Sequence, residues 1–217
     1  MKKHALVWAL LAGLLPLEVA AAGVATVVGL RGEASISQGG QVRPLGRGDE
    51  VDAGAVIRTG AAGRVKLRFG DGSVVVVGDD SSLRVDHLKL DGEGRRQSAG
   101  FVLDVGLIGQ TIAPGPAGSW SVRTPTAVTA VRGTEYVIEV DSSRGTAVHV
   151  RSGSVSVEPL APPKGVRLPG GWKPSAPVLL TPGADGTTCG PARYTCQPAD
   201  ALPAERVRQL EDRLSGV

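Results

Sequence analysis

The clearest candidate for binding chemistry is a row of three cations that alternate with apolar residues, Arg64-Val65-Lys66-Leu67-Arg68-Phe69. A period of two is typical of a β-strand, so the apolar residues would face a core and the cations would share the outer face. Such a row could bind an anionic polymer, although it more often forms a solvated face or protects a strand edge. We regard Arg64, Lys66 and Arg68 as a candidate binding surface.

A second candidate surface is the segment formed by Arg132, Gly133, Thr134 and Glu135. A glycine between polar residues commonly marks a turn that needs a positive φ or a close backbone approach. The segment therefore has a structural interpretation, as a turn, and a functional one, as a contact for a ligand or partner.

The residues that could support catalysis are few. Beyond the N-terminal segment the only histidines are His87 and His149. We expect His149, which is out of phase with its flanking valines, to be exposed, and His87 to be buried and hydrogen-bonded near a β-bulge. Asp79 and Asp80 are adjacent, so they suit neither the paired carboxylates of a hydrolase nor a shared metal. The sequence predicts no enzyme activity, catalytic residue, cofactor or metal site.

Two cysteines, Cys189 and Cys196, lie seven positions apart in a segment rich in proline and glycine. A pair of this kind in an exported protein most simply forms one disulfide that closes a small loop. A zinc site is disfavoured because no histidine or third cysteine lies nearby.

The N-terminus has the features of a secretory signal peptide. A short basic start precedes an apolar run from Ala5 to Leu17, and three alanines precede Gly23. We expect residues 1–22 to be removed by a signal peptidase, which leaves a soluble periplasmic protein. The rest of the sequence holds no apolar segment long enough to span a membrane.

The composition indicates the elements that must position these residues. Among 217 residues, 31 are glycine, 15 are proline and only 3% are aromatic, which favours many short strands and turns. The net charge is only +3, with 24 basic and 21 acidic residues, so it does not predict a nucleic-acid partner. We predict an all-β fold, a solenoid-like or sandwich-like array of short strands.

The chain divides by composition after the signal peptide. Short valine-rich runs separated by turn residues fill a β domain over 23–158. Ten of the fifteen prolines lie between Pro159 and Pro203, which predicts an irregular Pro/Gly-rich linker over 159–202 that contains the disulfide loop. Residues 203–217 read as a short C-terminal helix whose apolar stripe, Val207, Leu210 and Leu214, docks on another surface.

The β domain also carries a family resemblance. Its motifs are Leu45-Gly46-Arg47-Gly48-Asp49, Ile57-Arg58-Thr59-Gly60, Val65-Lys66-Leu67-Arg68-Phe69-Gly70-Asp71-Gly72-Ser73, Val122-Arg123-Thr124-Pro125-Thr126-Ala127-Val128 and Val131-Arg132-Gly133-Thr134-Glu135-Tyr136. In this order they resemble the FecR domain family, from about Val24 to Glu158. The resemblance implies a β-rich periplasmic domain that acts in signalling or protein contacts and has no known catalysis.

This sequence departs from the family pattern at one point. Family members that regulate iron uptake resemble a three-part design, with a cytoplasmic segment that binds a sigma factor, a transmembrane helix and this exported domain. Only four residues precede the apolar run here, so we expect an exported domain without the cytoplasmic anti-sigma segment.

Two functions follow as expectations. The first is a non-enzymatic periplasmic binding or signalling module that contacts another envelope protein. The alternative is a module that binds peptidoglycan or another cell-envelope polysaccharide, for which Trp120, Tyr136 and Trp172 would have to be exposed platforms. The sequence does not determine the oligomeric state.

Overall fold

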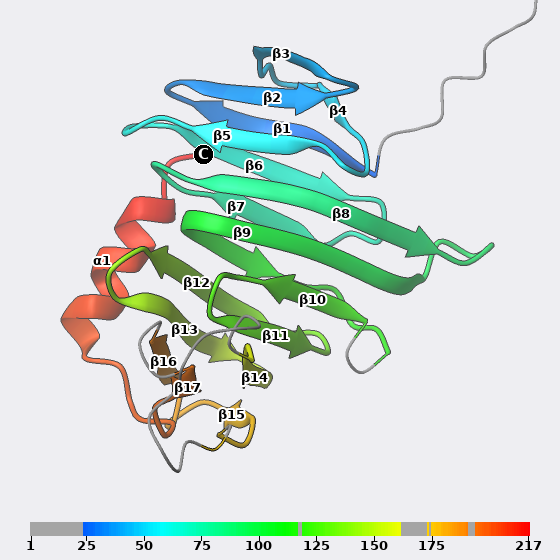
Figure 1. Ribbon diagram of the computed structural model, residues 1–217. Coiled ribbons are helices and arrows are strands. Elements are labelled where there is room, and N and C mark those ends of the chain that lie inside the picture. Colours follow the sequence, from blue (N-terminus) through cyan, green and yellow to red (C-terminus); the bar gives the residue numbers. More distant parts are fainter. Residues whose placement is uncertain (1–23, 117–118, 162–172, 174, 191–193) are drawn as a thin grey trace, which may run out of the picture.

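The computed structural model describes residues 24–116, 119–161, 173, 175–190 and 194–217. These residues form 17 strands and one helix, and the strands connect into one continuous sheet (Figure 1). The all-β prediction is confirmed. The pairings divide the strands into two sheets, which we call sheet A and sheet B.

The strands of each sheet follow one another in a regular order. In hydrogen-bonded order, sheet A contains β4 (Glu50–Val51), β1 (Ala25–Arg31), β6 (Arg64–Phe69), β7 (Val74–Val77), β9 (Arg96–Thr111), β12 (Glu135–Asp141), β13 (Gly145–Ser152), β16 (Gly186–Gly190) and β17 (Thr195–Cys196). Sheet B contains β3 (Gln41–Pro44), β2 (Ala34–Gln38), β5 (Val56–Thr59), β8 (Ser82–Leu90), β9, β10 (Trp120–Arg123), β11 (Ala127–Val131), β14 (Val155–Pro159) and β15 (Val178–Leu180). All pairings are antiparallel except that between β9 and β10.

The long strand β9 belongs to both sheets. Its first part pairs with β8 and β10 in sheet B, and its last part pairs with β7 and β12 in sheet A. The change of sheet occurs at Gly106, whose φ is +100°. A Cβ at this position would lie 2.4 Å from the Cα of Ser81, so the crossing requires glycine.

The core lies between the two sheets and follows the alternation of the strands. On β6, for example, Val65, Leu67 and Phe69 are buried. Phe69 packs edge-on against Trp120 with ring centroids 5.4 Å apart, and Phe101 completes this aromatic cluster. Each sheet therefore has one inner face and one outer face.

The sequence prediction of an irregular linker over 159–202 is wrong for part of that segment. β15 pairs with β14, and β16 pairs with β13, so both extend the sheets. The prolines do not prevent this because none lies within these strands; Pro177 and Pro182 fall just outside β15. The predicted disulfide between Cys189 and Cys196 joins β16 to β17.

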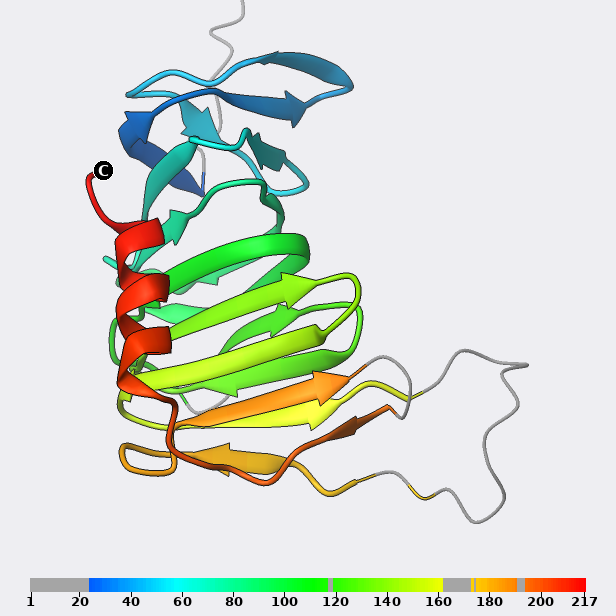
Figure 2. The same ribbon diagram turned by 90° about the vertical axis from the view of Figure 1, so that its left-hand side faces the viewer.

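Helix α1 (Ala204–Leu214) lies across the outer face of sheet A, as Figures 1 and 2 show. Leu202, just before it, contacts Gly186 of β16, and Leu214 at its end contacts Gly109 of β9. The helix returns the chain toward the N-terminal strands, where Val217 lies against Gly29 of β1. Among the described residues, no helix has the length and apolar character needed to cross a membrane.

Candidate interaction surfaces

The docking of α1 has a small apolar centre. Leu210 is buried against Leu107 of β9 and Val137 of β12, with Leu202 and Leu214 at the margin. The predicted apolar stripe of the helix therefore does dock on another surface, through Leu210 and Leu214. Because Leu107 and Val137 belong to the outer face of sheet A, the helix buries side chains that the alternation of the strands turns away from the main core.

Ion pairs surround this apolar centre. The carboxylate of Glu139 on β12 accepts hydrogen bonds from both Arg206 and Arg213 of the helix. Arg213 also pairs with both oxygens of Asp79, at 3.1 and 3.2 Å. Burial opposes the charge of Arg213, but its hydrogen bonds to Asp79 and Glu139 outweigh this and raise its pKa above the ordinary value.

The candidate row on β6 lies on this same outer face and is only partly free. Arg64 donates hydrogen bonds to the main-chain oxygens of Asp212 and Arg213, at the C-terminal end of α1. A cation at this end also interacts favourably with the helix dipole. Lys66 lies beside the C-terminal residue Val217 and Arg68 is exposed; neither makes an ion pair within the described part of the chain.

The second candidate segment, from Arg132 to Glu135, is a turn with structural contacts. Gly133 has a φ of +63°, and the hydroxyl of Thr134 donates to the oxygen of Ser154 at 3.0 Å. Glu135 pairs with Arg151 at 2.9 Å. Arg132 is exposed.

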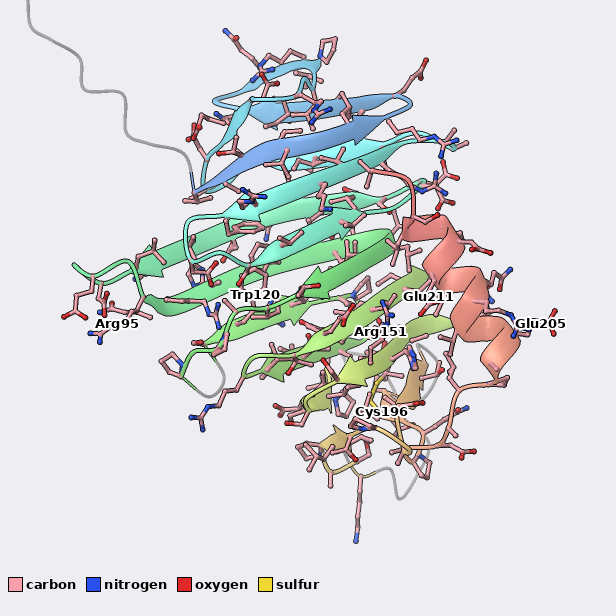
Figure 3. All side chains as sticks on the ribbon, turned by 180° about the vertical axis from the view of Figure 1, so that it is seen from behind. Arg95, Trp120, Arg151, Cys196, Glu205 and Glu211 are labelled. Atoms are coloured by element: carbon pink, nitrogen blue, oxygen red, sulfur yellow. A yellow bond between two sulfur atoms is a disulfide. The ribbon has the colours of Figure 1, made fainter. Side chains whose placement is uncertain are left out.

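Arg151 links this turn to the helix. Its guanidinium lies 3.4 Å from Glu211 of α1, and both side chains are labelled in Figure 3. The structure thus brings Arg64 and Glu135, from the two candidate segments, to the C-terminal half of α1. Between them lies a mainly apolar groove of about 340 Å³, bordered by Val74, Val76 and Leu214.

The two histidines lie on different sheets. The expectation that His149 is exposed is wrong: it lies on the outer face of sheet A but is buried near Leu202 and Arg206, with Nδ1 3.5 Å from Asp185. The expectation that His87 is buried is also wrong. It follows the predicted β-bulge on β8, is about 40% exposed and lies over Gly100 of sheet B.

A buried arginine, which the sequence does not reveal, ties β9 to the turn after β6. Arg96 forms an ion pair with Asp71, and the two side chains are only 1% and 4% exposed. Arg96 also donates to Ser73, Ser119 and the oxygen of Ala113. Since its guanidinium is fully engaged, this cluster serves structure.

The aromatic residues needed for sugar binding are buried. Trp120, labelled in Figure 3, and Tyr136 have no exposed surface. The indole N–H of Trp120 donates to the side-chain oxygen of Gln110 at 2.9 Å in the core between the two sheets. Burial raises the pKa of Tyr136 well above its ordinary value. Trp172 lies outside the described residues.

Within the described residues, the one helix packs on sheet A and leaves the outer face of sheet B without a helical cover. A cross-strand row runs over it, which we call the sheet B row: Val56, Arg84, Val102, Arg123, Val128 and Glu158. The charged members are exposed and the valines are half-buried. The described chain has three large exposed hydrophobic residues, Val42, Val105 and Leu179. Each lies opposite an outward-facing serine on the neighbouring strand of sheet B, so all three lie on its outer face.

A second hollow lies at the edge of sheet B. It has a volume of about 690 Å³ and is bordered by the edge strand β3 and by Glu33 and Arg58. The N–H of Leu45, just after β3, donates to the oxygen of Ala34 at 3.0 Å and so points toward β2. Because backbone groups alternate in direction along a strand, the N–H and C=O of Val42 point away from β2. This edge is open to solvent.

Comparison with the curated proteins finds no match. Among solved structures, two crystal structures from Parabacteroides distasonis, at 1.65 and 2.50 Å resolution and each described as a candidate anti-sigma factor, have similar folds. The first is 17% identical with a TM-score of 0.50, and the alignment covers 71% of this chain and 64% of that one. The second is 16% identical with a TM-score of 0.50, and 73% of each chain is covered.

These identities support a shared fold and nothing further about activity. The chain spans about two-thirds of the length of the first structure. A match to a family model is more specific, because residues 55–156 match the family described as FecR protein. This region holds most of the motifs noted in the sequence, and over these residues the chain carries a FecR domain.

Proposed function

We propose that this protein is a non-catalytic signalling module of the FecR type that resides in the periplasm and binds another envelope protein through its β domain. The observation that carries the proposal is the contrast between the two outer sheet faces. The face of sheet A is covered by α1, whereas the face of sheet B presents valines and arginines to solvent. An exposed surface that mixes apolar and charged side chains is a common protein-binding surface.

Action by binding, without catalysis, is supported by the positions of the titratable side chains. His87 and His149 lie on different sheets, so they cannot act on one substrate atom together. Arg96 and Glu139 are engaged in ion pairs that hold the fold.

The periplasmic location is supported by the N-terminal sequence and by the disulfide, which persists in oxidising compartments. The test is alkylation of the exported protein without reduction, followed by intact-mass measurement. A mature chain that begins at Gly23 and carries no alkylated thiol is expected. Retention of residues 1–22, or two modified cysteines, would contradict this part of the proposal.

Binding to a protein is tested by cross-linking in cells that produce the tagged full chain, with an unrelated exported protein as the control. We expect a discrete adduct that is sensitive to protease and is recovered again when the partner carries the tag. An adduct sensitive only to muramidase would favour the polysaccharide alternative, which the buried Trp120 and Tyr136 do not support.

The full chain is the appropriate material for this experiment. A chain that ends at Glu158 would lose β15 and β16, which pair with β14 and β13. It would also lose α1 and expose Leu107 and Val137. Non-specific adhesion of that fragment would then be difficult to separate from specific binding.

A further inference from the structure

The sheet B row has a regular chemical repeat. Its cross-strand order after Val56 on β5 is Arg84 on β8, Val102 on β9, Arg123 on β10, Val128 on β11 and Glu158 on β14. A charge therefore occurs on every second strand, with a valine on each strand between. The charged members of the row are, in order, two cations, Arg84 and Arg123, and one anion, Glu158.

The two cations are available for a partner. The side chain of Arg123 makes no hydrogen bond or ion pair within the described residues, and the side chain of Arg84 has only an exposed contact of 3.7 Å with Asp86. The intervening Val102 is half-buried, so an apolar side chain of a partner could complete its burial. The row thus combines charge with apolar surface, as a protein partner would require.

The spacing of the row selects the partner's secondary structure. Neighbouring strands lie about 4.8 Å apart, so successive charges of the row are separated by about 10 Å. Seven residues of an α-helix rise about 10.5 Å, and residues at i, i+4 and i+7 share one face. An extended strand laid along the row would place same-face residues about 7 or 14 Å apart, which does not match.

The chain already contains one amphipathic helix that packs across the outer face of a sheet. On α1, Arg206, Leu210 and Arg213 occupy positions i, i+4 and i+7, and all three contact the outer face of sheet A. There the arginines belong to the helix, and the carboxylates belong to the sheet: Glu139 lies on β12 and Asp79 lies in a turn. On sheet B the strands carry the arginines instead.

We propose that the sheet B row binds an amphipathic helix of the partner with acidic residues at i and i+7, a basic residue at i+14, and apolar residues at i+4 and i+11. The acidic residues would pair with Arg84 and Arg123, and the basic residue would pair with Glu158. The inference rests on the proposed function, since it names the surface and the chemistry of that protein contact. The valines favour such a helix over an anionic polysaccharide, which has no apolar side chains to cover them.

The test uses the full chain and a labelled synthetic helical peptide with Glu at i and i+7, Lys at i+14 and Leu at i+4 and i+11. We expect saturable binding by fluorescence anisotropy. The double variant Arg84→Glu/Arg123→Glu should weaken it at least about tenfold because attraction becomes repulsion. The matched control is Arg47→Glu/Arg208→Glu, which changes the net charge equally at two exposed positions off the row and should bind as wild type.

A charge exchange makes the test specific. A peptide with Lys at i and i+7 should bind the Arg84→Glu/Arg123→Glu variant better than it binds wild type. Equal loss in both double variants, no binding by wild type, or unchanged binding after Leu→Ser substitution in the peptide would overturn the proposal. Self-association of wild type that the double variant abolishes would identify a second copy as the occupant and would overturn it as well.

Failure of this inference is separable from failure of the proposed function. If cells yield the same protein adduct with wild type and with Arg84→Glu/Arg123→Glu, the protein contact exists but the row does not make it. If wild type yields no protein adduct, the proposed function itself fails.

Discussion

Arg213 of the C-terminal helix donates a hydrogen bond of 2.5 Å to Glu139, which lies 74 residues earlier on the central strand β12. Glu139 is almost fully buried although it faces outward from its sheet, because the helix covers it. The pair therefore reports directly on whether α1 is docked.

Arg213→Ala should loosen the helix without unfolding the sheets. The substitution leaves Glu139 with one arginine and Asp79 with none, and we expect a loss of about 1–2 kcal/mol in the local stability of the helix. Hydrogen exchange of residues 204–214 measures it. Arg208→Ala, at an exposed position of the same helix, is the control, and equal exchange in the two variants would contradict the docking role.

Arg96→Met should destabilise the whole protein by about 3–5 kcal/mol, because Asp71 would remain buried without its charged partner. Urea unfolding of the full chain provides the measurement. Arg95→Met is the matched control, since Arg95 is 69% exposed and makes only surface ion pairs. Similar midpoints for the two variants would show that the buried pair is dispensable.

Gly133→Val should cost about 1–3 kcal/mol, since φ is +63° and a Cβ would approach the backbone of Pro114 to 3.2 Å. The comparison is Gly92→Val, because Gly92 has no neighbour within 4 Å and no positive φ. Thermal melting distinguishes them. An unchanged melting temperature for Gly133→Val would refute the conformational requirement.

Asp141 should make the protein sensitive to acid. Hydrogen bonds, first from the hydroxyl of Ser143 and then from Arg144, hold the pKa of Asp141 well below its ordinary value of 3.8. The charged form is favoured in the folded state, so its contribution is complete above pH 3.8 and is lost as the pH falls through the lower folded-state pKa.

The Asp141→Asn variant tests this assignment. Melting temperatures of the variant and wild type, measured from about pH 6 to about pH 2.5, should converge as the pH falls. Parallel curves over the whole range would show that Asp141 does not contribute to acid sensitivity.

The alternation of the strands predicts which way a side chain points, but not what covers it. His149 points outward, as its phase relative to Val148 and Val150 predicts. Its burial depends on Leu202 and Arg206, more than 50 residues later in the chain. Local periodicity holds no information about such a distant cover, and the same reason hides the burial of Glu139.

Irregular register sets a second limit on prediction. Counting alternate residues back from the buried Ala99 assigns Gln97 to the interior, yet Arg96 is the buried residue. A register shift opposite, between Lys89 and Leu90, accompanies this change of phase. The turn glycine Gly133 was more predictable, because it has the positive φ that its polar sequence context suggests.

The sharing of β9 between the two sheets has a consequence for how force passes through the molecule. A pull on the outer face of sheet B, applied at Val102, acts on the same continuous backbone that carries Leu107 and Gly109 beneath α1. The link is covalent and its corner at Gly106 is sterically confined by Ser81. Sheet B therefore cannot be pulled away from sheet A as a separate layer. Tension applied to the outer face of sheet B reaches the residues under α1 through the single strand β9.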